Sequence, residues 1–395
     1  MRLAFVVQRY GSEVTGGAEL HCRWLAERLA RRHDVEVFAT RALDYVDWAD
    51  AYPAGDARVN GILVHRFSVR RRRKARVVAS LSRVVFDRPH TEEEEEAWVQ
   101  ANGPDSPALV EAVVRSSDRF DLVVFYCYRY YHTYHTLPLV RDRAVLVPTA
   151  EEDPAIQLKV FETLFRIPRG IVYLTPEEKE LVEERSGNAA VPSVVVGSGV
   201  ELPDDGRVDF RARHGLTRPF ILYVGRVDRN KGCVTLFAYF RLFLEETGLD
   251  VDLVVAGQPA IPIPDHPRIV PLGVVTEEEK VAALRAADVL VMPSPYESLS
   301  IVMLEAWKLG LPVLANGRCR VLAGQCLRSG GGLPYDGYTE FREAARILLE
   351  RADLRAALGR RGREYVEGEY RWDRVEAKME GFLSSCLSSR CRGGG

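Results

Sequence analysis

The sequence predicts an α/β protein made of two doubly wound halves. Short apolar stretches of strand length alternate with segments of helical spacing along the chain. This alternation starts a second time after residues 191–203, where Gly, Ser and Pro cluster. The length of 395 residues is ample for two domains. Alternating strands and helices are typical of a parallel sheet with helices on both faces, so each half is expected to be such a layer.

The first half begins with an apolar strand at 3–8, a polar, glycine-bearing loop at 9–17 and an amphipathic helix that follows it. The same unit recurs downstream. We expect further strands at 35–40, 122–127, 144–149 and 170–175, and helices around 154–165 and at 176–185.

The second half repeats this organisation. Its expected strands are 220–226, 252–257, 268–274, 288–294 and 312–316, and its expected helices are about 233–246, 277–286 and 300–309. We therefore expect domains at 1–195 and 196–371, with a helix and flexible tail in 372–395 that crosses back to the first domain. Two such halves facing each other would form a central cleft, with ligands beyond the carboxyl ends of the strands.

Composition excludes several classes of protein. Lys and Arg number 54 against 56 Asp and Glu, so no overall positive field attracts nucleic acid, and we expect no nucleic-acid partner. The apolar run at the start has only five residues, too short for a signal peptide or a membrane span, and we expect a cytoplasmic protein. Seven scattered cysteines, without a C-x-x-C pair, predict reduced thiols in the core.

Two charge runs stand out between the early strands, a basic one at 70–76 and an acidic one at 92–96. Each could simply be a solvated face. The functional alternative for the basic run is contact with an anionic acceptor or with lipid headgroups, as a peripheral protein of the inner membrane face. The acidic run could shield the basic one when no partner is bound.

The strongest local motif runs from Gly225 and Arg226 to Lys231 and Gly232, directly after an expected strand and before a helix. Two cations five residues apart, beside glycines that allow close backbone approach, suit a diphosphate. The alternative is an ordinary basic turn.

A second motif places Glu297 just before an expected helix and Glu305 in its second turn. Ser298 and Ser300 are suited to cap the helix start, and Gly310 its end. Free N–H groups at such a start attract phosphate, and the carboxylates could accept hydrogen bonds from sugar hydroxyls. A purely structural alternative is a favourable carboxylate–dipole interaction.

With both motifs in this order, the chain resembles the retaining glycosyltransferases of GT-B fold, glycosyltransferase family 4. That family carries G-R-x(4)-K-G and E-x(7)-E segments, and both are intact here. Gly16-Gly17-Ala-Glu19 resembles the family's first glycine loop, and 196–200 its asparagine-glycine-valine segment. The resemblance covers residues 3 to about 372.

The resemblance implies a role for each matched residue. Arg226 and Lys231 would bind the donor diphosphate and stabilise the leaving group without a metal, and Glu297 would hold the donor sugar. The remaining donor-binding positions would be Gly225, amides around Ser298, Leu299 and Ser300, Glu305 at the ribose, backbone groups of Gly273 and Val274 at the base, and Gly16 and Gly17 from the opposite domain. No cofactor is implied. The donor is a substrate, and UDP, GDP, ADP and dTDP sugars all remain open.

The chain also departs from the family pattern. The family usually has glycines where Ser298 and Ser300 stand, and often a histidine where Tyr126 ends a strand. His132 is a candidate substitute for that histidine. The aromatic run 126–135 could line a sugar-acceptor surface or could be half-buried packing. Arg129 is the expected anion contact in this run, and among the carboxylates after the next strand Glu151 is the expected acceptor contact.

The function predicted from the sequence is transfer of a sugar, with retained configuration, from a nucleoside-diphosphate sugar to a hydroxyl acceptor such as a polysaccharide or glycolipid. Two alternatives stay open: another GT-B chemistry such as nucleotide-sugar hydrolysis, and a catalytically silent GT-B module that binds sugar or a partner. A dinucleotide-dependent dehydrogenase is disfavoured, because no G-x-G-x-x-G follows the first strand of either half.

Overall fold

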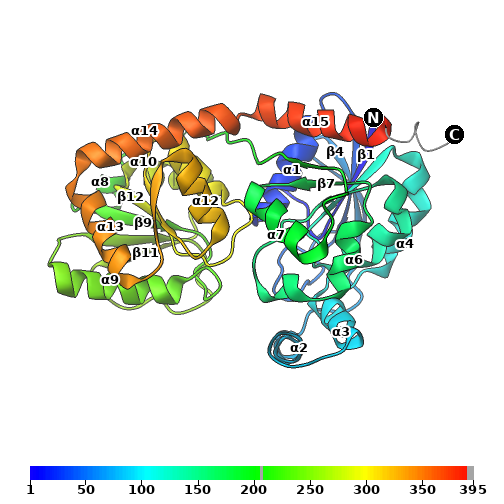
Figure 1. Cartoon of the computed structure of the whole chain (residues 1–395), viewed down its shortest axis with the longest axis horizontal. Coiled ribbons are helices and arrows are strands. Elements are labelled where there is room, and N and C mark those ends of the chain that lie inside the picture. Colours follow the sequence, from blue (N-terminus) through cyan, green and yellow to red (C-terminus); the bar gives the residue numbers. More distant parts are fainter. Residues whose placement is uncertain (205–207, 389–395) are drawn as a thin grey trace. The chain divides into compact units, whose positions relative to one another are not determined.

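The computed structural model describes residues 1–204 and 208–388, and the chain divides into two compact units (Figure 1). Unit 1 comprises Met1–Gly197 together with Glu376–Gly395, of which 389–395 lie outside the described residues. Unit 2 comprises Ser198–Val375. Each unit has its own sheet, parallel except for one strand pair in unit 1, and its own core.

Unit 2 contains a six-stranded sheet in the order β11-β10-β9-β12-β13-β14, in which all pairs are parallel. The strands are β9 Phe220–Val224, β10 Asp252–Ala256, β11 Ile269–Gly273, β12 Val289–Met292, β13 Val313–Asn316 and β14 Gly332–Tyr335. The helices are α8 Phe210–His214, α9 Cys233–Thr247, α10 Glu277–Ala286, α11 Ile301–Lys308, α12 Arg320–Ser329, α13 Tyr338–Glu350 and α14 Ala352–Glu369.

This strand order is that of a doubly wound fold, and it follows from strands that are apolar along their whole length. Leu222 pairs with Val254 on one side and Leu290 on the other, and all three are fully buried. Strands buried on both faces need helices above and below them. The order reverses between β9 and β12, and this switch point is where such sheets bind ligands.

Unit 1 contains an eight-stranded sheet in the order β3-β4-β2-β1-β5-β6-β7-β8. The strands are β1 Arg2–Val7, β2 Asp34–Thr40, β3 Gly55–Val59, β4 Ile62–Phe67, β5 Leu122–Tyr126, β6 Ala144–Val147, β7 Gly170–Tyr173 and β8 Ser193–Val195. The α-helices are α1 Gly17–Leu29, α2 Ala75–Asp87, α3 Glu92–Asn102, α4 Pro107–Ser116, α5 Tyr131–Thr136, α6 Val160–Arg166 and α7 Pro176–Ser186. Short 3-10 turns lie at η1 Ser117–Arg119, η2 Leu137–Arg143 and η3 Pro154–Gln157.

Among the described strands of this sheet, β3 and β4 form the one antiparallel pair, and this hairpin was not predicted from the sequence. Asn60 and Gly61 form its two-residue turn with φ values of 48° and 86°. An Asn-Gly pair between apolar residues favours such a turn, so the signal was present in the sequence.

Two regions of unit 1 differ from the expected elements. The helix expected around 154–165 is broken, because η3 ends and Leu158 is extended before α6 begins at Val160. The acidic run 92–96 opens α3 behind a capping box formed by Thr91 and Glu94. Figure 1 shows α2 and α3 side by side and away from the sheet.

The last helix, α15 Trp372–Ser388, passes from unit 2 into unit 1. Within unit 1, Arg32 Nη2 donates to Glu376 Oε2 at 2.8 Å. Phe382 and Cys386 pack on β7 at Gly170, where a Cβ would lie 2.7 Å from the Phe382 ring. The helix is thus docked on unit 1 by both charge and close packing.

The six cysteines among the described residues are free and buried, in agreement with the prediction of reduced core thiols; Cys391 lies outside the described residues. None of the described helices combines the length and apolar character that a membrane span requires.

Candidate functional site

The switch point of unit 2 brings both sequence motifs together. The turn 225–232 leaves the carboxyl end of β9, and the loop 293–300 leaves that of β12. The two backbones touch at Gly232, where a Cβ would lie 2.2 Å from the Pro293 carbonyl oxygen. Gly225 is packed as tightly, since a Cβ on Gly257 would lie 1.9 Å from its carbonyl oxygen. No residue larger than glycine fits at positions 232 and 257.

Four charged side chains form two ion pairs in these loops. Arg226 Nε donates to Asp228, whose other oxygen accepts from the backbone N–H of Lys231 at 2.7 Å. Lys231 Nζ lies 2.7 Å from Glu297 Oε1 and joins the two motifs. The side chains of Arg226 and Lys231 are 33% and 30% exposed, whereas Glu297 is 12% exposed. Both cations therefore keep a face to solvent.

Glu305 lies deeper, in α11, and is 3% exposed. One of its carboxylate oxygens accepts from Lys280 Nζ of α10 at 2.8 Å, and the other has no hydrogen-bond partner among the described residues. Burial raises the pKa of the Glu305 carboxyl, and Lys280 partly offsets this rise. The carboxylate thus has one oxygen available for a ligand hydroxyl.

Ser300 stands at the N-cap position of α11, but its side chain makes no capping hydrogen bond. Its backbone has φ 68° and ψ 86°, the left-handed region that a side chain disfavours. The hydroxyl is buried and has no hydrogen-bond partner among the described residues. The prediction of an N-cap serine is thus confirmed in position for Ser300, although its hydroxyl does not cap the helix, and it is wrong for Ser298, because the helix begins only at Ile301.

The neighbouring backbone groups are held in place. The carbonyl oxygen of Leu299 accepts from the side-chain amide of Gln325. At the end of β11, Gly273 has φ 71° and its carbonyl oxygen accepts from the N–H of Gly257 at 2.7 Å. Val274, next in the chain, is 74% exposed. The structure thus leaves an exposed backbone segment at the edge of the same loop cluster.

In unit 1 the strand order reverses between β1 and β5, and the glycine loop follows β1. Arg9 and Glu19 form a buried ion pair of 2.6 Å, and Arg9 also donates to two loop carbonyls. Gly16, with φ 142°, packs directly on this pair, because a Cβ there would lie 2.4 Å from Glu19 Oε2. Gly17 is the first residue of α1.

Tyr126 and His132 lie inside unit 1, with 0% of each exposed. The Tyr126 hydroxyl lies 3.1 Å from His21 Nδ1, and His21 Nε2 lies 3.0 Å from the carbonyl oxygen of Gly197. Burial lowers the pKa of His21 and that of His132 to about 4. A neutral His21 must donate from Nε2 to the carbonyl, so its Nδ1 accepts from Tyr126. Of the two alternatives for the aromatic run 126–135, this burial favours packing over contact with a sugar for Tyr126 and His132.

Arg129 and Glu151 do come together at the carboxyl ends of β5 and β6. Arg129 Nη1 lies 2.6 Å from Asp153 and Nη2 lies 3.5 Å from Glu151. The loop that carries Glu151 is fixed from beneath by Glu178, which accepts from the N–H groups of Ala150 and Leu174 at 2.6 Å each. Burial raises the pKa of Glu178 to about 8.

Both charge runs are tied into unit 1. Arg70 Nη2 lies 3.0 Å from the buried Asp105, and Arg72 lies 3.5 Å from Asp47. In the acidic run, Glu95 is 2% exposed and accepts from the N–H of Val160. The side-chain partners of the basic run thus include Asp105, Asp47 and the carbonyl oxygen of Tyr45.

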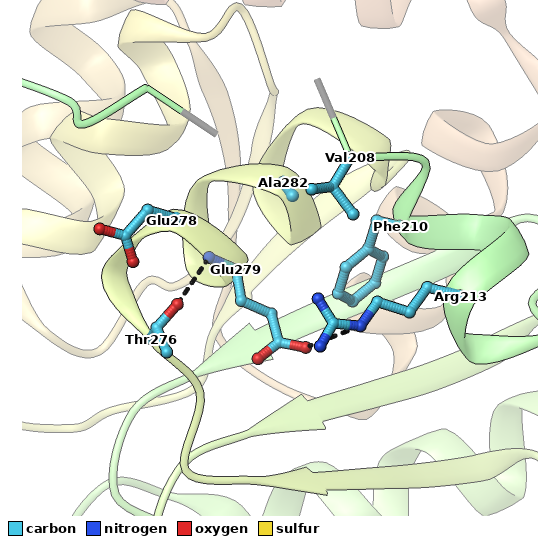
Figure 2. A pocket seen from close by; sticks show the side chains of 7 residues that line it. All are labelled: Val208, Phe210, Arg213, Thr276, Glu278, Glu279 and Ala282. Atoms are coloured by element: carbon cyan, nitrogen blue, oxygen red, sulfur yellow. Dashed lines mark hydrogen bonds and ion pairs between the residues drawn. The ribbon is translucent and has the colours of Figure 1, made fainter. Parts of the chain in front are cut away.

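A small pocket of about 70 Å³ lies between α8 and the start of α10 (Figure 2). Its charged lining includes Glu279, whose N–H donates to Thr276 and whose carboxylate lies 4.0 Å from Arg213. A nucleotide needs a pocket several times larger. None of the residues that the sequence analysis singled out lines it.

Sequence reasoning missed four side chains that hold the site residues. Asp228 accepts from the N–H of Lys231, and Lys280 donates to Glu305. Arg9 donates to Glu19, and Glu178 accepts from the N–H of Ala150. Asp228 lies inside the first motif and could have been found there. Lys280 could not, because only the tertiary packing of α10 against α11 brings it to Glu305.

The chain is similar to known proteins in both sequence and fold. Residues 218–351 match the family described as Glycosyl transferases group 1. A D-inositol 3-phosphate glycosyltransferase of Streptomyces avermitilis is 31% identical over 302 residues, which is 66% of this chain and 61% of that protein. The chain thus spans less than two thirds of the length of this relative.

Solved structures resemble the chain along nearly its whole length. Sucrose-phosphate synthase from Thermosynechococcus elongatus has a TM-score of 0.72 at 19% identity and covers 98% of this chain and 99% of its own. HepE of Anabaena, solved with UDP and glucose, has a TM-score of 0.70 at 16% identity. The match covers 98% of this chain and 100% of the HepE chain. These likenesses show that the fold is GT-B.

Replacing Lys280 by Ala leaves the Glu305 carboxylate buried without its cation. Breaking a buried pair costs about 3–5 kcal/mol, so we expect the free energy of unfolding to fall by that amount at pH 8. The loss shrinks as the pH falls, because burial raises the pKa of the Glu305 carboxyl and lets it take a proton in the folded state. Urea unfolding followed by circular dichroism measures it. Glu277→Gln, which removes the exposed partner of Lys280, is the matched control. An equal fall in the free energy of unfolding in this control would contradict the claim that the buried Lys280–Glu305 pair is the stabilising one.

The raised pKa of Glu178 makes the free energy of unfolding depend on pH. Its pKa of about 8 in the folded state lies above the unfolded value near 4.5, so folding binds a proton between these values. The free energy of unfolding should therefore fall as the pH rises from 5 to 8, by at most about 1.4 kcal/mol per pH unit. Glu178→Gln removes this contribution. Urea unfolding at pH 5, 6.5 and 8 gives the slope of the free energy of unfolding against pH for the wild type, Glu178→Gln and the control Glu180→Gln. A slope in Glu178→Gln equal to that of the wild type would refute the raised pKa of Glu178.

Proposed function

We propose that the chain, which belongs to the glycosyl transferases group 1 family and has the GT-B fold, transfers a sugar from a nucleoside-diphosphate sugar to a hydroxyl acceptor with retained configuration. One observation carries the proposal. The Lys231–Glu297 ion pair joins the two motifs at the switch point of unit 2, where a doubly wound sheet binds its ligand. The likeness to a D-inositol 3-phosphate glycosyltransferase supports it.

In this proposal, Arg226 and Lys231 bind the diphosphate. Departure of a nucleoside diphosphate from the anomeric carbon develops negative charge on the leaving oxygen, and fixed cations stabilise that charge. Each cation already has its geometry set, Arg226 by Asp228 and Lys231 by Glu297. They would supply the charge that a metal ion supplies elsewhere, without a metal of their own.

The remaining donor contacts follow from the same loops. We assign Glu297 to the sugar hydroxyls, Glu305 to the ribose through its unpartnered oxygen, and the backbone of Gly273 and Val274 to the base. Retention needs no side-chain nucleophile if the acceptor hydroxyl attacks from the face that the diphosphate leaves. The leaving phosphate then takes the acceptor's proton.

For the acceptor we assign Arg129 and Glu151, which share a loop cluster at the carboxyl ends of β5 and β6. Tyr126 and His132 are buried, so we assign them to the support of that loop cluster. A phosphorylated polyol is one acceptor to test, because the Streptomyces relative is named for inositol 3-phosphate.

The donor site is tested by calorimetric titration of UDP, GDP, ADP and dTDP, with and without magnesium. We expect one nucleotide to bind equally well in both conditions. Arg226→Ala and Lys231→Ala should each weaken it at least about 10-fold, since each removes a charge-assisted hydrogen bond. Arg229→Ala, an exposed arginine of the same turn, is the matched control and should bind normally. Absence of binding to all four would favour a silent GT-B module.

The exposed arginines of the basic run give a second test. We propose that Arg71 and Arg72, whose side chains are 73% and 69% exposed, contact anionic groups of the acceptor or of a lipid surface. Vesicles of phosphatidylcholine that contain the anionic lipid phosphatidylglycerol should sediment the protein. The same vesicles should sediment it less after Arg71→Gln with Arg72→Gln. Arg351→Gln with Arg371→Gln, of similar exposure, is the control.

If the double variant at 71 and 72 instead keeps vesicle binding but loses affinity for inositol 3-phosphate, the contact is with a soluble acceptor. Unchanged behaviour toward both probes would refute the role of the basic run.

A further inference from the structure

Ser300 combines two unfavourable features at one position. Its backbone lies in the left-handed region at φ 68°, and its hydroxyl is buried without a hydrogen-bond partner among the described residues. A residue with a side chain is strained in that backbone region, and a buried hydroxyl without a partner is costly as well. Glycine, which the family resemblance predicts here, would avoid both costs. A strained residue with an unmet polar group indicates a function for the side chain.

The position of Ser300 defines what its hydroxyl could meet. It is the N-cap residue of α11, an eight-residue helix whose first N–H groups attract anions. It lies three residues after Glu297, which we assign to the sugar, and five before Glu305, which we assign to the ribose. In a nucleotide sugar the two phosphates lie between these groups.

From this geometry we infer that the Ser300 hydroxyl donates a hydrogen bond to the donor phosphate that carries the sugar. The inference rests on the proposed function and goes beyond it, because the resemblance assigns only backbone amides at this position. The residue is 8% exposed, and rotation about its χ1 angle moves the hydroxyl among three staggered positions. The side chain would thus add a donor that a glycine at this position lacks.

Two substitutions separate the hydroxyl from the strain. Ser300→Ala removes the hydroxyl and keeps a side chain at φ 68°, whereas Ser300→Gly removes both. Both variants should bind the preferred nucleoside diphosphate about 10-fold more weakly than the wild type, the change expected for one hydrogen bond to a charged group. The glycine variant should melt a few degrees above the alanine variant, because it relieves the strain.

The nucleoside monophosphate with the same base distinguishes ligation from a structural role. It lacks the phosphate that carries the sugar, so both variants should bind it as the wild type does. The measurement is calorimetric titration of the full chain with both nucleotides, with circular dichroism to verify folding.

Three other outcomes have defined meanings. Wild-type affinity for the diphosphate in both variants, together with loss of binding in Arg226→Ala, overturns the inference and leaves the proposed function standing. Equal weakening of diphosphate and monophosphate binding overturns it in favour of a structural role. If the wild type binds no nucleotide, the proposed function fails, and the inference fails with it.

Discussion

The contact between Gly232 and Pro293 is the constraint on which the site of unit 2 depends. A Cβ at position 232 would lie 2.2 Å from the Pro293 carbonyl oxygen, so only glycine lets the turn after β9 rest on the loop after β12. This contact brings Lys231 within 2.7 Å of Glu297 although 66 residues separate them. Because β9 and β12 are adjacent parallel strands, the loops that follow them begin near each other. The absence of a side chain at Gly232 then lets the two loops come into contact.

The same loops hold polar groups that the fold leaves unsatisfied. Among the described residues, Ser300 at the N-cap of α11 has a buried hydroxyl without a hydrogen-bond partner, and Glu305 in the second turn has a buried carboxylate oxygen without one. Each costs stability, since buried polar groups in folded proteins are normally hydrogen-bonded. The two costs lie within six residues of each other, which is more simply explained by a shared ligand than by two independent defects of packing.

Periodicity predicted the two doubly wound sheets, because buried parallel strands are apolar along their whole length and cannot be mistaken for surface loops. It missed the β3–β4 hairpin, whose strands are short and partly exposed, although Asn60-Gly61 was a turn signal. The donor motifs were found because their residues are close in sequence. Lys280 and Glu178 were not, because they reach Glu305 and Ala150 only through packing between elements.

Each unit carries a glycine and an arginine–carboxylate pair after the first strand of its doubly wound core. Gly16 adjoins Arg9–Glu19 in unit 1, and Gly225 adjoins Arg226–Asp228 in unit 2. Their exposure separates their roles. Arg9 is 4% exposed and donates to Glu19, Thr15 and Leu43, so it has little capacity left for a ligand and serves to fix the loop. Arg226 is 33% exposed, so although Asp228 pairs with it as Glu19 pairs with Arg9, its guanidinium keeps a charged face that a diphosphate can reach.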